Sequence, residues 1–289
     1  MTPPEIALPA PSPDAGPIGL LRKYAKIFRV TLIERMTYRA DFLLTTFLRF
    51  LPMLTTILLW QAIYSASGEE SIENYRYDEM IAYLLLVNIS RMFSSMPGLA
   101  GGIAREIRDG SLKKYLLQPL DMLNYLLSYR VAHKVSYIIA SAIPYGILFY
   151  LCRGYFVGHV PADPQTWLAY AASLILAFFV GFYFEAAVGM VGFWFLEVTS
   201  LLFIVMTLNF FVSGHMLPLD LLGPTWSTIL KALPFQYMAY FPAVVFLKKV
   251  QGAELLFELT RQALWALAFW ALSRWLYRKG LRHYGAYGG

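Results

Sequence analysis

The chain of 289 residues is poor in charged side chains. Asp, Glu, Lys and Arg together make up 15% of it, whereas soluble domains carry about 25%. Hydrophobic residues make up 58%, and the mean hydropathy is +0.53. This composition excludes a disordered chain, a nucleic-acid-binding domain and an ordinary soluble enzyme. It predicts an all-α polytopic membrane protein.

Several motifs that carry chemistry are also missing. The single cysteine, Cys152, excludes an intrachain disulfide and a cysteine-based metal cluster. The sequence has no G-x-x-x-x-G-K-[ST] phosphate loop and no H-E-x-x-H zinc motif. Ser213 and His215 lie close in sequence, but no acid accompanies them as a hydrolase triad requires. We therefore expect no catalytic, cofactor-binding or metal-binding residue in this chain.

Long apolar stretches predict six membrane spans, because one crossing needs about 20 mostly apolar residues. The predicted spans are residues 42–64, 79–99, 132–151, 166–188, 192–213 and 254–276. A glycine-rich turn at residues 189–192 separates the fourth span from the fifth. We treat residues 18–289 as a single transmembrane domain.

The distribution of basic residues predicts the orientation of these spans. Sixteen of the 24 basic residues fall in the N-terminal segment, the loop after the second span and the C-terminus. The first loop on the opposite side is acidic, with Glu69, Glu70, Glu73 and Asp78. Positive charge marks the cytoplasmic side. Both termini are therefore expected in the cytoplasm, which the even number of spans also requires.

The N-terminal segment predicts a tail followed by a surface helix. Residues 1–17 contain six prolines, and we expect a disordered cytoplasmic tail. Residues 18–39 place apolar side chains on one helical stripe and basic side chains off it. Such a helix lies in the plane of the membrane surface. A short soluble helix packed on a partner is the alternative.

The cytoplasmic segment 101–121 is too polar to span the membrane. It predicts a short amphipathic hairpin or helix pair over residues 103–118, bent at Gly110 and ended by Pro119. Its exposed face mixes both signs of charge, which favours protein docking over simple adhesion to lipid. The charged residues are Arg105, Glu106, Arg108, Asp109, Lys113 and Lys114. A connector without a partner is the alternative.

The outer segment 214–243 is apolar but carries four prolines, which prevent one continuous spanning helix. Two short helices fit instead, around residues 224–232 and 235–241. We expect them to dip into the outer leaflet or to cap the bundle. Irregular backbone at that depth must be buried in protein or line a cavity.

Charged residues inside the membrane mark function or packing. Arg91 lies near the middle of the second span and shares a helix face with Leu84, Asn88 and Ser95. This face predicts either a translocation path or an interface between permease subunits, and a structural ion pair is the alternative. Glu185 and Glu197 flank the turn between the fourth and fifth spans. We expect them to form ion pairs at the inner interface, with a transport role as the alternative.

Taken together, these elements resemble the transmembrane subunit of ABC-2-type ABC transporters. The stretch EIRDGSLKKYLLQPLD at residues 106–121 is similar to the family's I-R-x-G-x-L-x-x-x-L-L-x-P pattern. SGHMLPLDLLGPTW at 213–226 and LPFQYMAYFP at 233–242 are similar to its outer elements. The resemblance covers about residues 20–285, and the nearest subgroup is a set of bacterial permeases of uncharacterised substrate.

The resemblance implies partners and a place in the cell. Two permease subunits, identical or different, would form a path between them in the cell (inner) membrane, surrounded by lipid. Two copies of an ABC ATPase subunit would bind ATP and Mg and drive export. The element 103–118 matches the family's coupling helix, which docks on the ATPase.

Two other classes of function stay open at this point. A lipid-modifying membrane enzyme would need a clustered acid and base, for which Glu185 and Glu197 are the available pair. A secondary transporter would show inverted repeats and broken helices in both halves. Proline and glycine interrupt this chain mainly before the last span.

Overall fold

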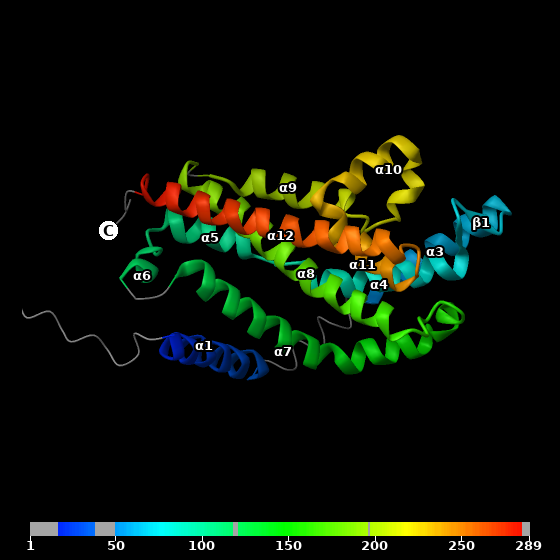
Figure 1. Ribbon diagram of the computed structural model, residues 1–289, viewed down its shortest axis with the longest axis horizontal. Helices are drawn as coiled ribbons and strands as arrows, with labels where there is room; N and C mark the ends of the chain where they lie inside the picture. The colour runs from blue at the N-terminus through cyan, green and yellow to red at the C-terminus, as the bar shows by residue number, and fades with distance from the viewer. Residues whose placement is uncertain (1–16, 38–49, 118–120, 196, 285–289) are drawn as a thin grey trace, which may run out of the picture.

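The protein forms a bundle of long helices that share one axis, as the computed structural model in Figure 1 shows. The structure describes residues 17–37, 50–117, 121–195 and 197–284. Residues 1–16 of the predicted tail and the start of the first predicted span lie outside this part of the chain. The long helices are α1 (Pro17–Thr37), α3 (Phe50–Ser67), α4 (Tyr77–Ser94), α5 (Leu99–Arg108), α7 (Met122–Leu151), α8 (Pro164–Gly189), α9 (Thr199–Val212) and α12 (Gly252–Leu281).

Shorter elements connect these helices. A two-stranded antiparallel hairpin, β1 (Ser71–Ile72) and β2 (Tyr75–Arg76), precedes α4. At the opposite end α6 (Lys113–Leu116) follows α5. The 3₁₀ helices η1 (Arg153–Phe156) and η2 (Met190–Phe193) follow α7 and α8. The outer segment contains η3 (Leu219–Leu222), α10 (Gly223–Ala232), η4 (Pro234–Met238) and α11 (Tyr240–Phe246).

Helices α4 and α8 form the centre of the bundle. Of their most apolar 18-residue stretches, 61% and 67% of the residues are buried, against 11% to 22% for α3, α7 and α12. Helix α12 packs along α8, and α11 packs against both central helices. The peripheral helices α3, α7 and α12 therefore turn apolar side chains away from the bundle, as lipid contact requires.

The prediction of six spans is confirmed only in part. Five helical stretches of the described residues are long and apolar enough to cross a membrane. The predicted span 192–213 is not confirmed, because the helix described within it is α9, with 14 residues. At about 1.5 Å per residue α9 is roughly 21 Å long, less than the ~30 Å hydrocarbon core.

The glycines at 189 and 192 do not make the predicted turn. The helical path of α8 continues through η2 to Phe193. A Cβ atom on Gly189 would lie 2.8 Å from the carbonyl oxygen of Ala100, and one on Gly192 would lie 3.0 Å from Cα of Ala104. These glycines therefore allow close packing between two helices, which a sequence reading mistakes for a turn.

Gly181 makes the tightest of these contacts. A Cβ atom there would lie 2.0 Å from the carbonyl oxygen of Ser94 at the end of α4. The contacts of Gly181, Gly189 and Gly192 follow one another along both segments. Helices α8 and η2 therefore run parallel to α4 and α5, with the two backbones in direct contact.

The outer segment folds as the prolines predict. Pro224 and Pro234 occupy first-turn positions of α10 and η4, where a missing N–H costs no helical hydrogen bond. Two short helices were expected around 224–232 and 235–241, and the chain forms α10 there, followed by η4 and α11.

The predicted surface helix 18–39 is present as α1, but its orientation differs from the expectation. In Figure 1, α1 runs beside α7 along the long axis of the molecule, and the two helices are in contact. A helix in the membrane plane would cross that axis. Packing on α7 therefore replaces the predicted interfacial orientation in this arrangement.

A glycine pair tests the importance of the α8–α4 contact. Gly181→Ala is expected to lower the free energy of unfolding by about 1–3 kcal/mol, because the new methyl group overlaps the backbone of α4. Gly146→Ala in α7 is the control, since a Cβ atom there meets nothing within 4 Å. Thermal unfolding in detergent measures both. Equal melting temperatures for the two variants would contradict the packing argument.

Candidate functional site

A large cavity opens between α3, α4 and α9. Its volume is about 1080 Å³, at the upper end of the range for ligand pockets. Helix α8 and the junction between α4 and α5 contribute to its wall. Helix α9 has no buried residue and makes few contacts with the bundle, so the cavity separates it from the central helices.

The predicted polar face of the second span lies on the wall of this cavity. Leu84, Asn88, Arg91 and Ser95 all line it. The Asn88 side chain donates to the carbonyl oxygen of Leu84, 2.9 Å away. The structure thus brings the four residues together, while their role as a translocation path stays a prediction.

Arg91 contacts two residues from the region of α9. Its Nη1 lies 2.9 Å from Nε2 of His215, and its guanidinium lies over the Phe210 ring, 5.1 Å from the centroid. Arg91 lies 14 residues, or about 21 Å, into α4, so this contact places His215 well away from the start of that helix.

The helical path is interrupted between the end of α4 and the start of α5, and we call this interruption the break. Ser95 is extended, Pro97 lacks an N–H donor, and Gly98 has a positive φ of 74°. The break leaves backbone groups of the last turn of α4 without helical partners. Because this region packs against α7 and α8, other side chains must satisfy those groups.

Three charged side chains satisfy the backbone at the break. Glu185 of α8 accepts from the N–H of Met96 at 3.0 Å. The Lys134 ammonium donates to the carbonyl oxygens of Met92 at 2.6 Å and Ser95 at 2.5 Å. Arg130 donates to the carbonyl oxygen of Pro97 at 3.0 Å.

This arrangement differs from one expectation. Lys134 and Arg130 are expected in a cytoplasmic loop, but both lie within α7, and Lys134 is buried. Glu185 is buried, and besides the N–H of Met96 it interacts electrostatically with Arg130 and Lys134. Its expected pairing with basic residues at the inner interface stays a prediction.

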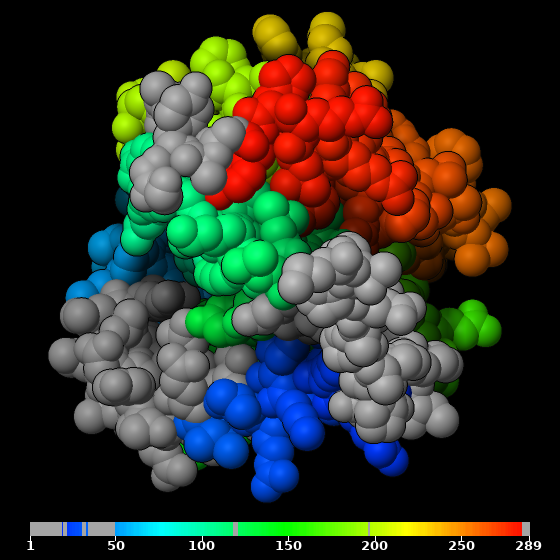
Figure 2. Space-filling model, turned by 90° about the vertical axis from the view of Figure 1, so that its left-hand side faces the viewer, coloured from blue at the N-terminus to red at the C-terminus, as the bar shows by residue number. Residues whose placement is uncertain are grey.

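Helices α5 and α6 form the predicted amphipathic hairpin at the end of the bundle. Ile103, Ile107, Leu112 and Tyr115 are buried, whereas Leu116 is 48% exposed. Gly110 has a φ of 73° and allows the bend. Arg105, Arg108, Asp109, Lys113 and Lys114 are exposed. Figure 2 views this end of the molecule, where the hairpin lies beside the last turns of α12.

Ion pairs stiffen the hairpin and join it to α9. The Lys114 ammonium lies 2.5 Å from Oε1 of Glu106, and Arg108 lies 3.6 Å from Glu197. Burial and the nearby Glu106 raise the pKa of Tyr115. Hydrogen bonds from Thr199, together with Arg108, lower the pKa of Glu197. Glu197 therefore lies next to the hairpin, on an exposed surface.

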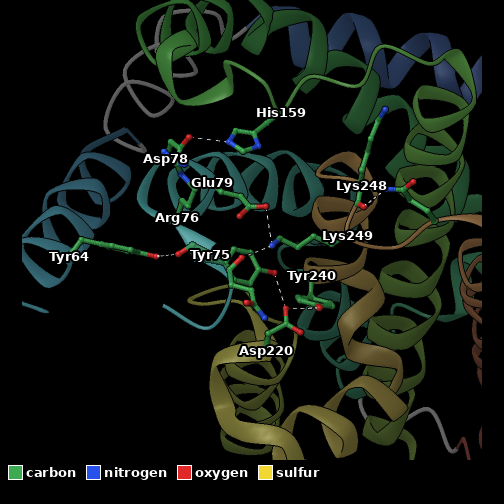
Figure 3. A network of polar contacts seen from close by, with 12 residues as sticks. Tyr64, Tyr75, Arg76, Asp78, Glu79, His159, Asp220, Tyr240, Lys248 and Lys249 are labelled. Atoms are coloured by element: carbon green, nitrogen blue, oxygen red, sulfur yellow. Dashed lines mark hydrogen bonds and ion pairs between the residues drawn. The ribbon is translucent and has the colours of Figure 1, made fainter. Parts of the chain in front are cut away.

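A polar network holds the outer end together (Figure 3). Tyr75 of strand β2 and Tyr240 of α11 each donate a hydrogen bond to Oδ2 of Asp220 at 2.8 Å. Lys231 of α10 pairs with the other oxygen of Asp220. Burial alone would raise the pKa of Asp220, but the hydrogen bonds from Lys231 and Tyr75 outweigh it and lower the pKa.

A second part of this network ties the outer loops to α4. Lys249 pairs with Glu79 at 2.9 Å, and its ammonium lies 3.8 Å from the centroid of the Tyr75 ring. His159 lies 3.2 Å from Asp78 at the start of α4. Within the described part of the chain, no three His, Cys, Asp or Glu side chains gather as a metal site requires.

Several of these residues were not identified from sequence. Asp220 and Lys231 lie in the apolar, proline-rich segment 214–243, and Lys249 follows it. The charge of each is the signal that could have drawn attention to it. Lys134 carried the same signal, but the predicted start of its span at residue 132 put it at the membrane surface. Only the packing shows what each charge contacts.

The long apolar helices, their buried charges and the cavity define a multi-pass membrane protein. The model of the ABC-2 family transporter proteins matches residues 50–288, and the chain belongs to this family. A search of curated proteins finds no match. Membership makes this a membrane transport protein of the permease type, a class that is not itself catalytic and that works with an ABC ATPase subunit.

Substitutions of Glu185 and Glu197 test how much the hydrogen bond at the break between α4 and α5 stabilises the fold. Glu185→Ala is expected to lower the free energy of unfolding by about 2–4 kcal/mol, because it leaves the buried N–H of Met96 without its acceptor and removes a negative charge close to the buried Lys134 ammonium. Glu197→Ala, on the exposed surface, is expected to leave the melting temperature unchanged. Thermal unfolding in detergent compares them. A wild-type melting temperature for Glu185→Ala would contradict the role of this hydrogen bond.

Asp220 gives a test of the outer network. Asp220→Ala is expected to lower the free energy of unfolding by about 1–3 kcal/mol at pH 7, since two tyrosine hydroxyls and Lys231 lose their partner. The lowered pKa makes this contribution fully present above about pH 4 and lost as the pH falls further. Unfolding curves from pH 3 to 7 measure it, with Glu70→Ala in the exposed loop as the control. A constant difference between Asp220→Ala and the wild type across this range would contradict the assignment.

Proposed function

We propose that this chain is the permease subunit of an ABC exporter, in which it forms the substrate path and a separate ATPase supplies the energy. One observation carries the proposal. The stretch Tyr77–Arg108 lines the cavity along α4 and continues, after the capped break, into the exposed hairpin. A force applied to the hairpin therefore reaches the cavity wall through one continuous piece of chain.

The α5–α6 hairpin is the proposed docking site for the ATPase. Its apolar face packs on α8 and η2, so the hairpin is anchored in the bundle. Its outer face presents charges of both signs and the exposed side chains of Leu116 and Leu117. Such a mixed surface suits a groove on another protein. ATP and Mg would bind to that partner, because this chain has no phosphate-loop motif.

A second permease subunit is proposed to close the cavity. Exposed apolar side chains of α3 and α9 lie on the two sides of the cavity, among them Leu59, Ile63 and Phe203. A second subunit, identical or different, would cover these faces and complete a path between the two. The pair would bind two ATPase copies, one on each hairpin.

The proposed location is the cell (inner) membrane with both termini in the cytoplasm. The described structure supports this orientation through the position of its charges. Hairpin α5–α6 and the basic end of α12 lie at one end of the bundle, and the acidic β1–β2 loop lies at the other (Figure 1). The basic end is expected on the cytoplasmic side.

Charge reversal tests the docking site. The double variant Arg105→Glu with Lys113→Glu is expected to reduce co-purification of the ATPase at least tenfold, because both side chains are exposed on the hairpin. Quantitative mass spectrometry of the affinity-purified membrane complex gives the stoichiometry. The matched control is Arg76→Glu with Arg153→Glu, which reverses two exposed charges at the opposite end.

Two results would reject the proposal. One is a wild-type complex that contains no ATPase. The other is a hairpin variant that keeps the ATPase at the wild-type stoichiometry. A hairpin variant that inserts into the membrane, loses the ATPase and loses transport would support it.

A further inference from the structure

A polar cluster occupies the side of the cavity formed by the end of α9. Arg91 meets His215 Nε2 at 2.9 Å, and the Phe210 ring lies against both, with its centroid 4.4 Å from that of the imidazole. A guanidinium donates hydrogen bonds and accepts none. His215 Nε2 is therefore the acceptor, and its Nδ1 carries the proton as a second donor.

One atom of this cluster, Nδ1 of His215, is buried and has no hydrogen-bond partner among the described residues. Buried polar atoms in folded proteins are nearly always satisfied by protein, water or a ligand. A buried donor of this kind on the imidazole that contacts the guanidinium therefore indicates a place for a polar ligand group.

The charged residues of the cavity wall indicate whether the polar group of the ligand is an anion or a cation. Among the described lining residues, the charged ones are Arg91 and Glu185. The Glu185 carboxylate accepts the N–H of Met96 at the break, and Arg91 contacts His215 and Phe210 on the cavity wall. The planar guanidinium has five N–H donors in an arrangement that matches carboxylate and phosphate oxygens. The cluster is therefore suited to an anionic group.

The rest of the wall is rich in methionine. Six of the eleven methionines of the chain line this one cavity: Met53, Met92, Met96, Met206, Met216 and Met238. Methionine is unbranched and flexible, so a methionine surface adapts to apolar groups of varied shape. Such a wall suits a flexible hydrocarbon chain better than a rigid or sugar-like molecule.

We propose that Arg91 and His215 bind the anionic head of an amphiphile, a carboxylate or phosphate, while its hydrocarbon chain lies along the methionine wall. This inference rests on the proposed function, in that it names the class of substrate that the cavity would carry. The head and the chain bind to different parts of one cavity, and each can be tested separately.

Binding to the purified full chain in neutral detergent tests the head group. The probes are pyrene-labelled hexadecanoate, its methyl ester and the quaternary ammonium compound with the same chain. The acid is expected to bind about tenfold or more tightly than the ester, as a charge-assisted hydrogen bond predicts. Equal affinities for the acid and the ester would overturn the proposal. Displacement of the acid by millimolar inorganic phosphate would show a site for free anions and would also overturn it.

Variants of Arg91 test whether this residue causes the preference for the acid over the ester. Arg91→Gln is expected to lower the affinity for the acid to that for the ester, and Arg91→Lys is expected to keep part of the difference. Arg153→Gln is the matched control, because it removes an exposed arginine on η1, outside the described lining of the cavity. An unchanged preference for the acid in Arg91→Gln would overturn the assignment.

A label on the wild-type protein avoids any dependence on the folding of a variant. A fatty acid with a photoreactive group near its carboxyl end is expected to attach to residues 84–96 or 206–217. Attachment only elsewhere would overturn the proposal. Failure of acid binding in a complex that still transports would reject this inference alone. Loss of the ATPase partner with acid binding intact would reject the proposed function instead.

Discussion

The architecture depends on the way the end of α4 is held against α8. Gly181 lets the two backbones approach until no side chain fits between them. At the break that follows, Glu185 and Lys134 take the place of the missing helical hydrogen bonds. Burying these charges is costly unless every bond is made. The junction is therefore stable in one arrangement, and the cavity on one side and the hairpin on the other keep a fixed relation.

The same constraint links the two ends of the molecule. The outer network fixes the start of α4 through Asp78 and Glu79, and the buried carboxylate fixes its end. Between them α4 presents its polar residues to the cavity. The peripheral helices make fewer contacts and bury little. This combination, a fixed central helix beside a loosely packed α9, allows a cavity wall to move while the connection to the hairpin is kept.

Beyond the network around Asp220, the charges of three regions differ in their surroundings. Those on the hairpin are exposed and suit a protein partner. Those at the break are committed to backbone groups. Arg91 lies with His215 in the cavity, where it is in reach of a ligand. Because buried, half-buried and exposed charges cost different amounts of desolvation, residues of the same type have different partners in different parts of one molecule.

The sequence alone determined the features that local chemistry controls. Apolar runs predicted most of the long helices, prolines predicted the short outer helices, and Gly110 predicted the bend of the hairpin. The polar face through Asn88 and Arg91 follows from helical spacing, and it does line the cavity. The partners of Glu185, Arg91 and Asp220 were decided only by the tertiary structure. These contacts join residues that are 11 to 145 positions apart, and a buried charge is satisfied by whichever group the packing brings to it.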